Sequence, residues 1–276
     1  MRYSPKRELK RFLDEDVGKG DITSKLLQKK KISARIITRE DTIVAGTKFV
    51  KEVFSLKKCK VRIIKKDGSS AKSNQTILDI SGDARNILTC ERTALNLLSR
   101  MCGIATQTNN LKKQIQKTGS KSKLFATRKT APGLRFFDKE AVKIGGGEKH
   151  RMTLNEMIMI KDNHLEVENS IENLFSKAKK TRGKIEIEVE TQKDAILCAR
   201  LGADIIMLDN FSPEQIKKTI KKLTELKLRD KVMLEASGRI NSKNITKYAK
   251  TEIDMISVGS ITNSVDGIDL SLEISS

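Results

Sequence analysis

A cationic stretch between Thr127 and His164 holds the side chains of this sequence that are best suited to bind an anion. Arginine is planar and binds carboxylates or phosphates through two parallel hydrogen bonds, whereas lysine acts as a flexible point charge. A run of three glycines inside the stretch suits close approach of the backbone to a ligand. The stretch therefore predicts a pocket for a substrate with several negative charges. Its candidate residues are Arg128, Lys129, His150, Arg151 and Lys161.

Carboxylates follow in the next part of the chain. Glu186, Glu188 and Glu190 alternate along one apolar run, so all three share one face of a predicted strand. Three carboxylates on one face repel one another unless a cation or a basic partner lies among them. Mg²⁺ is commonly held by one or two carboxylates together with substrate phosphates, and Glu188 with Asp209 matches that pattern. The middle of the chain therefore predicts a Mg²⁺ site.

Small residues stand where the last apolar runs end. Ser237 and Gly238 follow one run, and Gly259 and Ser260 follow another, each before a predicted helix. Free backbone N–H groups at such places can hold a phosphate. The three groups of residues together indicate a polyanionic substrate with a pyrophosphate leaving group. Phosphoribosyl transfer, phosphoryl transfer and an aldol-type reaction of a sugar phosphate all remain open at this point.

Six short apolar runs, each ending in polar residues and followed by a helical pattern, must position these groups. Successive βα units predict a parallel sheet, and right-handed crossovers favour a barrel whose chemistry lies at the carboxyl ends of the strands. An open doubly wound sheet is the alternative. The runs cover residues 124–127, 157–160, 185–189, 205–208, 232–234 and 255–258.

The first hundred residues differ from the rest and predict a separate α+β domain. A helical pattern covers residues 7–16, and a second one covers 84–101 with Gly103 as its expected stop. The segments between them alternate in hydropathy as strands do. The predicted strands cover residues 32–38, 42–45, 59–65 and 76–81.

The net charge of +20 invites a nucleic-acid interpretation, but its distribution opposes one. Much of the excess lies in pairs such as Lys217 and Lys218, on segments with the pattern of amphipathic helices. We therefore expect no nucleic-acid partner, and keep a basic RNA-binding protein as a remote alternative. The four cysteines are widely spaced, which predicts reduced thiols in the cytosol. No apolar run approaches the length of a membrane span.

The motifs also resemble a known family. Residues Thr127 to Arg135, Gly145 to Met152 and Ile160 to His164 are similar, in order and spacing, to the signature of the carboxylating quinolinate phosphoribosyltransferases. The resemblance extends over nearly the whole chain. Further similar blocks are residues 15–16, 20–24, 91–96, 187–190, 207–210, 234–238 and 256–259.

The resemblance implies an enzyme of NAD biosynthesis. It would transfer the phosphoribosyl group of phosphoribosyl pyrophosphate to quinolinate with decarboxylation, giving nicotinate mononucleotide, pyrophosphate and CO₂. The implied fold is an N-terminal α/β sandwich over residues 1–103 and an incomplete α/β barrel over 104–262, with 263–276 packing back on the first domain. The implied assembly is a head-to-tail homodimer, with hexamers as an alternative. A homologue associated with molybdenum transport, with a different substrate, is the rival inside the fold.

The resemblance further implies a role for each motif residue. Arg92 would reach the partner subunit's site, while Arg128, His150 and Arg151 would face the quinolinate carboxylates. The remaining roles are catalysis by Lys129, Lys161, Glu188 and Asp209, with Mg²⁺ and ribose on Glu188 and Asp209, and the 5′-phosphate on Ser237, Gly238, Gly259 and Ser260.

Four nearby side chains are not given a catalytic role. We expect Lys139 and Lys143 to be solvated, with a contact of Lys139 to the site as the alternative, and His164 to make a local hydrogen bond. Arg239 stands where many family members have a small residue, so it adds a phosphate contact or points to solvent.

Overall fold

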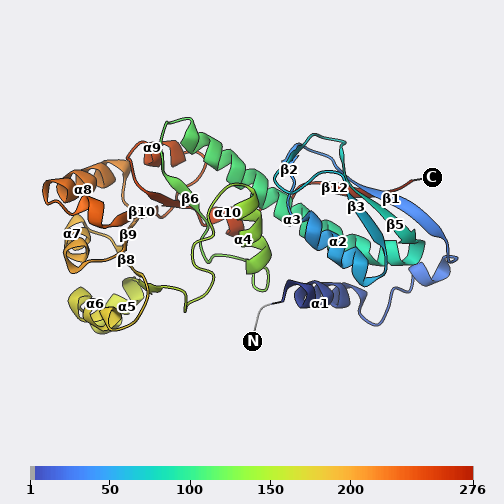
Figure 1. Cartoon of the computed structure of the whole chain (residues 1–276), viewed down its shortest axis with the longest axis horizontal. Coiled ribbons are helices and arrows are strands. Elements are labelled where there is room, and N and C mark those ends of the chain that lie inside the picture. The colour runs from blue at the N-terminus through green and yellow to red at the C-terminus, as the bar shows by residue number, and fades with distance from the viewer. Residues whose placement is uncertain (1–3, 276) are drawn as a thin grey trace. The chain divides into compact units, whose positions relative to one another are not determined.

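The computed structural model describes residues 4–275 and divides into two compact units (Figure 1). The first unit comprises Met1–Asn109, Ala131–Gly146 and Ser264–Ser276, and the second comprises Asn110–Thr130 and Gly147–Asn263. The mixed α/β class is confirmed, because an antiparallel sheet lies in the first unit and a parallel sheet in the second. The domain boundaries drawn from the sequence stay a prediction.

The first unit is built on a four-stranded antiparallel sheet in the order β12-β1-β5-β3. Its core side is apolar because β1 alternates, with Ala34 and Ile36 buried and Ser33 and Arg35 exposed on the other side. The apolar face of α2 supplies further fully buried side chains to the core. The elements are α1 (Pro5–Val17), η1 (Ser24–Leu26), β1 (Lys31–Thr38), β2 (Thr42–Ile43), α2 (Thr47–Leu56), β3 (Lys60–Ile63), β4 (Ser70–Ala71), β5 (Thr76–Asp83) and β12 (Leu270–Ser275).

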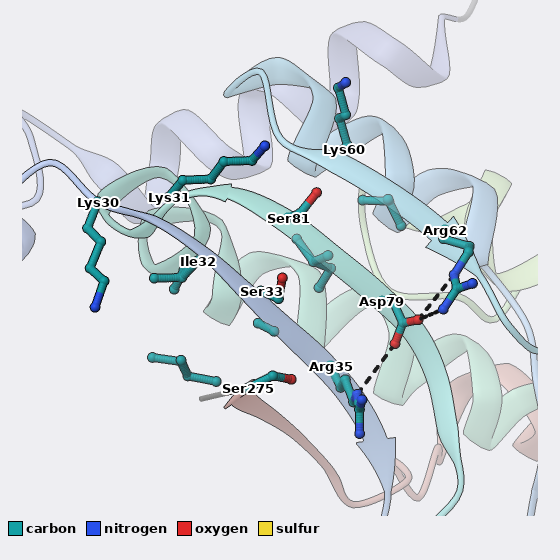
Figure 2. A pocket seen from close by; sticks show the side chains of 14 residues that line it. Lys30, Lys31, Ile32, Ser33, Arg35, Lys60, Arg62, Asp79, Ser81 and Ser275 are labelled. Atoms are coloured by element: carbon teal, nitrogen blue, oxygen red, sulfur yellow. Dashed lines mark hydrogen bonds and ion pairs between the residues drawn. The ribbon is translucent and has the colours of Figure 1, made fainter.

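The other face of this sheet is open and basic (Figure 2). Asp79 of β5 lies between two arginines from the neighbouring strands: Arg62 donates to its carboxylate, and Arg35 Nε lies 3.7 Å from it. Lysines and serines complete a shallow groove of about 930 Å³. Part of the positive charge of the chain is therefore gathered on this face, where a single carboxylate compensates two of the cations.

A long helix, α3 (Ala84–Gln116), follows the sheet and contradicts one prediction. Gly103 was expected to stop the helix, but the helix continues through it for three more turns. A Cβ built on Gly103 would lie 2.1 Å from the backbone oxygen of Asp266. The glycine is therefore explained by the close approach of a distant segment, which the local sequence does not reveal.

Helix α4 (Arg135–Ile144) belongs to the first unit by its packing. Phe137 is fully buried and meets the Phe49 ring edge-on at 5.0 Å. Asp138 accepts two hydrogen bonds from the Arg100 guanidinium, at 2.7 and 2.9 Å. Lys139 has no exposed surface, so the prediction that it is solvated is wrong, whereas Lys143 is exposed as expected.

The second unit holds a six-stranded parallel sheet in the order β6-β11-β10-β9-β8-β7. Each of the six predicted runs forms one of its strands. Within the described residues β6 and β7 are the two edges of the sheet and do not pair with each other, so the incomplete barrel implied by the resemblance is confirmed rather than a closed one. The strands are β6 (Lys123–Phe125), β7 (Ile158–Ile160), β8 (Ile185–Val189), β9 (Ile205–Asp209), β10 (Met233–Ser237) and β11 (Met255–Ser257).

The two faces of the parallel sheet differ in chemistry. Ile187, Ile206 and Leu234 lie side by side on one face of the sheet and are fully buried. Burial of each such side chain contributes about 1.5–3 kcal/mol. Glu186 and Glu235 occupy alternate positions and face inward. The helices are α5 (Asp162–Glu168), α6 (Ile171–Lys179), α7 (Gln192–Leu201), α8 (Pro213–Glu225), α9 (Ile245–Ala249) and α10 (Ser260–Asn263), with the short η2 (Arg229–Lys231).

Two further observations concern chemistry and membranes. The four cysteines are free and buried, and burial raises the pKa of the Cys90, Cys102 and Cys198 thiols to about 12. They are therefore unreactive thiols.

Within residues 4–275, none of the helices has the length and apolar character required to cross a membrane.

The close approach at Gly103 can be tested by substitution. We expect Gly103→Ala to lower the free energy of unfolding by about 1–3 kcal/mol, because the added methyl group overpacks the contact with Asp266. Elsewhere in a helix the same change is stabilising by about 1 kcal/mol. Urea unfolding followed by circular dichroism measures the effect. Asn110→Ala, at an exposed position of α3, is the control and should leave the midpoint unchanged or raised. An unchanged midpoint for Gly103→Ala would contradict this explanation.

Candidate active site

The parallel strands bring most of the predicted site residues to the carboxyl end of the sheet. Parallel strands have their carboxyl ends on the same side, where the loops carry the chemistry in barrels of this kind. Arg92 belongs to the first unit and is exposed on α3. The residues at or just beyond the strand ends are Arg128 and Lys129 after β6, Lys161 after β7, Glu188 in β8, Asp209 in β9, Ser237 and Gly238 at β10, and Gly259 and Ser260 after β11.

Lys161 and Glu188 form an ion pair at the carboxyl end of the sheet. The Lys161 ammonium donates a hydrogen bond to Glu188 Oε2, and the two residues come from the neighbouring strands β7 and β8. Glu188 is mostly buried, with 11% of its side chain exposed. The cation expected among the carboxylates of β8 is present beside Glu188, whereas Glu190 lies beyond the strand and is exposed, so the prediction that it shares this strand face is wrong.

The chain turns sharply after β9 and again after β10, and these two turns pack together beside a small cavity. Asn210, Gly238 and Arg239 have left-handed backbone conformations, with φ of 55°, 97° and 51°. A Cβ on Gly238 would lie 2.3 Å from Asn210 Oδ1, so only glycine fits there. These three residues and Tyr248 line a cavity of about 360 Å³. The site is therefore open enough for a small anionic group such as a phosphate.

One expectation about this turn is wrong. Gly238 was expected to precede a helix directly, but α9 starts only at Ile245. The intervening turn is held by side chains instead, because Asn241 and Asn244 donate to the Arg239 carbonyl at 3.3 and 3.1 Å. A phosphate at this turn would depend on local N–H groups and on Arg239, without the dipole of a following helix.

Strands β6 and β11, the first and last of this sheet along the chain, are neighbours, and the segments that follow them also meet at its carboxyl end. Thr262 donates a hydrogen bond to the Lys129 carbonyl at 2.8 Å, which fixes the segment after β6 against the segment after β11. A Cβ on Gly259 would come within 3.1 Å of the Lys129 side chain. The structure thus brings Lys129 next to the predicted phosphate-binding residues of β11.

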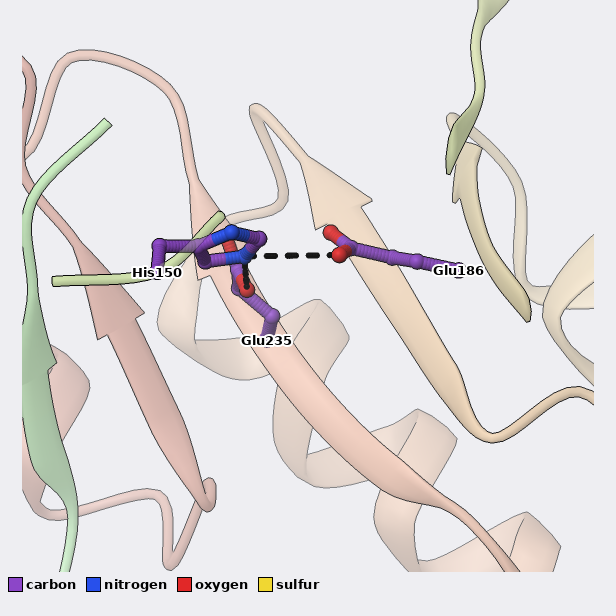
Figure 3. A group of neighbouring side chains, drawn as sticks. All are labelled: His150, Glu186 and Glu235. Atoms are coloured by element: carbon purple, nitrogen blue, oxygen red, sulfur yellow. Dashed lines mark hydrogen bonds and ion pairs between the residues drawn. The ribbon is translucent and has the colours of Figure 1, made fainter. Parts of the chain in front are cut away.

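His150 reaches the interior of the barrel (Figure 3). The chain before it runs beside β6, where Glu148 forms a β-bridge with Phe125. His150 Nε2 lies 3.1 Å from Glu235 Oε2 and 3.3 Å from Glu186 Oε2, and both carboxylates are fully buried. The Phe125 ring packs against the imidazole at a centroid distance of 5.8 Å. These contacts join β6, β8 and β10 through one side chain.

The charges of this cluster depend on one another. Burial opposes protonation of His150, but the Glu186 and Glu235 carboxylates outweigh it and raise the pKa of His150 to about 9. Burial also raises the pKa of Glu186, against the effect of His150. The backbone N–H of Arg151 opposes a second ring proton, because it donates to His150 Nδ1 at 2.8 Å. The first proton of the ring therefore lies on Nε2, facing the carboxylates.

Arg151 and Arg128 form the cationic part of the site. The Arg151 guanidinium donates to the Met157 carbonyl at 3.2 Å and contacts the Met159 sulfur at 3.1 Å. Burial and then the nearby charge of Arg128 lower the pKa of Arg151, while Glu186 acts in the opposite direction. Arg128 Nε is buried and has no hydrogen-bond partner within residues 4–275. An anion between the two guanidinium groups would relieve their repulsion.

Other residues of the cationic stretch have local roles. His164 Nδ1 accepts a hydrogen bond from the Lys161 backbone N–H at 2.9 Å, so the prediction of a local role for His164 is confirmed. Glu235 is not among the predicted site residues, although it contacts His150. Its inward position two residues before Ser237 in the same strand was the signal that could have found it.

The fold and this site define an α/β-barrel enzyme with a polyanionic substrate. Family models agree: residues 21–102 match the quinolinate phosphoribosyl transferase N-terminal domain and residues 104–273 match the C-terminal domain of the same enzyme. The chain belongs to the quinolinate phosphoribosyltransferase family.

Individual relatives support this membership over the full length. A probable nicotinate-nucleotide pyrophosphorylase [carboxylating] of Methanothermobacter thermautotrophicus is 41% identical and covers 96% of this chain and 97% of its own. The nicotinate-nucleotide pyrophosphorylase [carboxylating] of Dictyostelium discoideum is 38% identical, with 99% and 96% covered. The solved structure of the nicotinate-nucleotide pyrophosphorylase from Francisella tularensis has a TM-score of 0.92 at 38% identity, with 98% and 96% covered.

The turn at Gly238 provides a test of the phosphate site. We expect Gly238→Ala to weaken binding of a phosphate-bearing substrate at least about tenfold, because the new methyl group displaces Asn210 and the backbone resists a left-handed alanine. Isothermal titration calorimetry measures the affinity. Gly119→Ala is a matched control, since Gly119 also has a positive φ of 75° but has nothing within 4 Å of its built Cβ. Equal affinities in the two variants would show that Gly238 is not part of a phosphate site.

Proposed function

We propose that this protein transfers the phosphoribosyl group of phosphoribosyl pyrophosphate to quinolinate and releases pyrophosphate and CO₂, leaving nicotinate mononucleotide. The observation that carries the proposal is the family membership over both domains, together with relatives named as carboxylating nicotinate-nucleotide pyrophosphorylases. The cationic residues of the site support the same substrate. This reaction belongs to NAD biosynthesis, and the four buried free thiols suit a cytosolic location.

Recognition of quinolinate would rest on the arginines. Quinolinate carries two adjacent carboxylates on a pyridine ring, and planar guanidinium groups bind carboxylates through paired hydrogen bonds. Burial and then the nearby charge of Arg128 lower the pKa of Arg151, so the two guanidinium groups lie close enough to repel each other. A dicarboxylate placed between them would neutralise both charges.

Bond formation would occur between the pyridine nitrogen and the anomeric carbon of the ribose. As that bond forms, the bond to pyrophosphate breaks, and its electron pair leaves with the pyrophosphate oxygen. The ribose carbon passes through an oxocarbenium-like state, which a carboxylate such as Glu188 stabilises. Lys161, paired with Glu188, would then hold a negatively charged substrate group beside the reacting carbon.

Decarboxylation would follow on the same ring. Once the nitrogen carries ribose, the ring is a pyridinium cation and can accept the electron pair of the bond to the 2-carboxylate. CO₂ leaves, and the ring carbon takes a proton in its place. The substrate itself supplies the electron sink, so Lys129 and Lys161 act in this proposal by binding and orienting charge.

Magnesium is part of the proposal because its preferred donors are present. Glu188 and Asp209 offer carboxylate oxygens from the adjacent strands β8 and β9, and Mg²⁺ prefers one or two such groups with substrate phosphates. When bound there, the ion would neutralise pyrophosphate charge and favour its departure. The 5′-phosphate of the ribose would bind at Ser237, Gly238, Gly259 and Ser260.

The first test is turnover with the proposed substrates. We expect the protein with Mg²⁺, quinolinate and phosphoribosyl pyrophosphate to release one CO₂ for each nicotinate mononucleotide formed. Arg151→Lys should raise the KM for quinolinate at least about tenfold, because lysine keeps the charge but loses the two-pronged geometry. Labelled CO₂ release and chromatography of the nucleotide measure both quantities.

Two controls make this test decisive. Lys217→Ala removes a cation from α8, away from the strand ends, and should leave the kinetics unchanged. Nicotinate should not replace quinolinate, because it lacks the second carboxylate. Turnover with nicotinate and none with quinolinate would refute the substrate assignment.

The proposed assembly is a homodimer in which Arg92 completes the partner subunit's site. Arg92→Ala and Arg151→Ala should each be inactive alone. Mixing them should restore up to about a quarter of the wild-type activity, since half of the randomly exchanged dimers carry one intact site of two. Activity assays after subunit exchange, monitored by mass spectrometry of isotope-labelled subunits, measure the effect. Exchange without any recovery would exclude a role of Arg92 in the partner's site.

A further inference from the structure

The open face of the antiparallel sheet carries hydroxyl groups on three neighbouring strands (Figure 2). Ser33 in β1 pairs with Ser275 in β12 and with Ser81 in β5. Ser81 pairs in turn with Lys60 in β3. Residues directly opposite each other in a ladder have their side chains on the same face of the sheet. The three serines therefore form one row, the serine row, which lines the groove of this face and ends at Lys60.

Basic side chains border the serine row on both sides. Lys31 and Arg35 lie two positions before and after Ser33 in β1, so the three side chains share one face. Arg62 stands two positions after Lys60 in β3 and shares its face in the same way. A smaller pocket of about 310 Å³ continues the groove at the start of β1, since several residues line both. The lysines that line the groove and this pocket are Lys29, Lys30, Lys31, Lys58 and Lys60.

The arginines and the lysines of this face differ in what they contact. Arg62 donates to the Asp79 carboxylate, and Arg35 Nε lies 3.7 Å from it, so both arginines already face an anion. Within residues 4–275, the five lysines form no ion pair and no side-chain hydrogen bond. The carboxylate nearest to them in the pocket is Asp83, which accepts a hydrogen bond from the Arg85 backbone N–H at 3.0 Å. A concave surface with such an excess of one charge attracts ions of the opposite charge.

The donors of the groove favour phosphate oxygens over carboxylates. Lysine ammonium and serine hydroxyl groups are common donors to phosphates. Carboxylates are bound best by the planar fork of arginine, and both arginines of this face are engaged by Asp79. Within residues 4–275, the hydroxyl groups of the serine row make no hydrogen bond, so they can donate to a ligand. The groove crosses all four strands, about 14 Å, which suits a chain of linked phosphates rather than a single one.

Other polyanions fit the groove less well. A single nucleic-acid strand gains about 1–3 kcal/mol for each base that stacks on an aromatic side chain, and none of the described residues that line the groove or the pocket is aromatic. An acidic peptide laid across the strands would find their backbone N–H and C=O groups paired in the ladders, so its own backbone would lack partners. A second copy of the same basic face would be repelled.

We infer that the groove binds inorganic polyphosphate, a chain of linked phosphates, through the serine row and the lysines around it. The groove belongs to the first unit, and none of its lining residues has a part in the proposed reaction. It is therefore a second binding site, separate from the phosphate contacts proposed at the carboxyl end of the parallel sheet. It also gives a use to part of the net charge of +20 that the proposed reaction leaves unexplained.

Lysine footprinting on the full chain locates the ligand, with inorganic tripolyphosphate as the probe. At a probe concentration ten times its Kd, we expect acetylation of Lys30, Lys31 and Lys60 to slow by up to about tenfold, because only the free fraction reacts. Lys217 and Lys218, exposed on α8, should keep their rates and serve as the control. Mass spectrometry of the acetylated peptides measures each lysine separately, so probe bound elsewhere does not obscure the result. No slowing at the groove, or equal slowing on α8, would overturn the inference.

A substitution without change of charge separates a built site from general attraction. Ser33→Val with Ser81→Val removes two donors and introduces residues that suit strands. Footprint titrations should show tripolyphosphate binding to the groove weakened at least about tenfold, because two hydrogen bonds to a charged ligand are lost. Lys31→Gln with Lys60→Gln, at exposed positions, should weaken it as much and does not depend on packing. Unaltered binding in either double variant would refute the site.

Competing polyanions test the identity of the ligand. At physiological ionic strength, an oligothymidylate and an oligoglutamate of equal total charge should each protect the groove lysines at least about tenfold less well than tripolyphosphate. Tighter protection by the oligothymidylate would identify a nucleic-acid surface, and tighter protection by the oligoglutamate a surface for an acidic protein; either result would overturn the inference. Ser33→Val with Ser81→Val should keep full turnover of quinolinate. A protein without that turnover would refute the proposed function, while the footprint alone decides on the groove.

Discussion

Pairing of buried charges is the constraint on which the site depends. The inner face of the parallel sheet presents Glu186, Glu188 and Glu235 to a mostly buried interior, where unpaired carboxylates are strongly unfavourable. The groups that meet them, His150 through Nε2 and Lys161 through its ammonium, come from the segments before and after β7. Glu148 holds the backbone before His150 to β6, and the contacts with Glu186 and Glu235 hold the His150 side chain.

The parts of the structure that follow from local pattern could be predicted from the sequence. Apolar runs marked all six strands of the parallel sheet, and alternation along residues 185–189 put Glu186 and Glu188 on one face. Periodicity alone favoured a closed barrel, and only the family resemblance implied an incomplete one. Whether a sheet closes into a barrel depends on whether its two edge strands pair in space, and the sequence of a single strand does not encode that pairing.

Features that depend on distant contacts could not be predicted. From the sequence alone, Gly103 is expected to end a helix. In the structure, a glycine is required there because the backbone of Asp266, far along the chain, comes close to it. A lysine in a helix, such as Lys139, is expected to be solvated, but the packing of α4 buries this side chain completely. The contact of His150 with Glu235 joins two segments that are distant in sequence, and residue type and spacing do not reveal which distant side chains meet.

The pairing of β12 with β1 gives the N-terminal sheet a strand from the other end of the chain. Residues 270–275 follow β1 by most of the length of the chain, so β1 leaves the ribosome long before this neighbour exists. Until then that edge of the sheet exposes unpaired backbone groups, which are a template for association with other chains. The parallel sheet of the second unit, whose strands lie between them in sequence, can form first. The addition of β12 therefore moves the open edge of this sheet from β1 to a strand that is made much later.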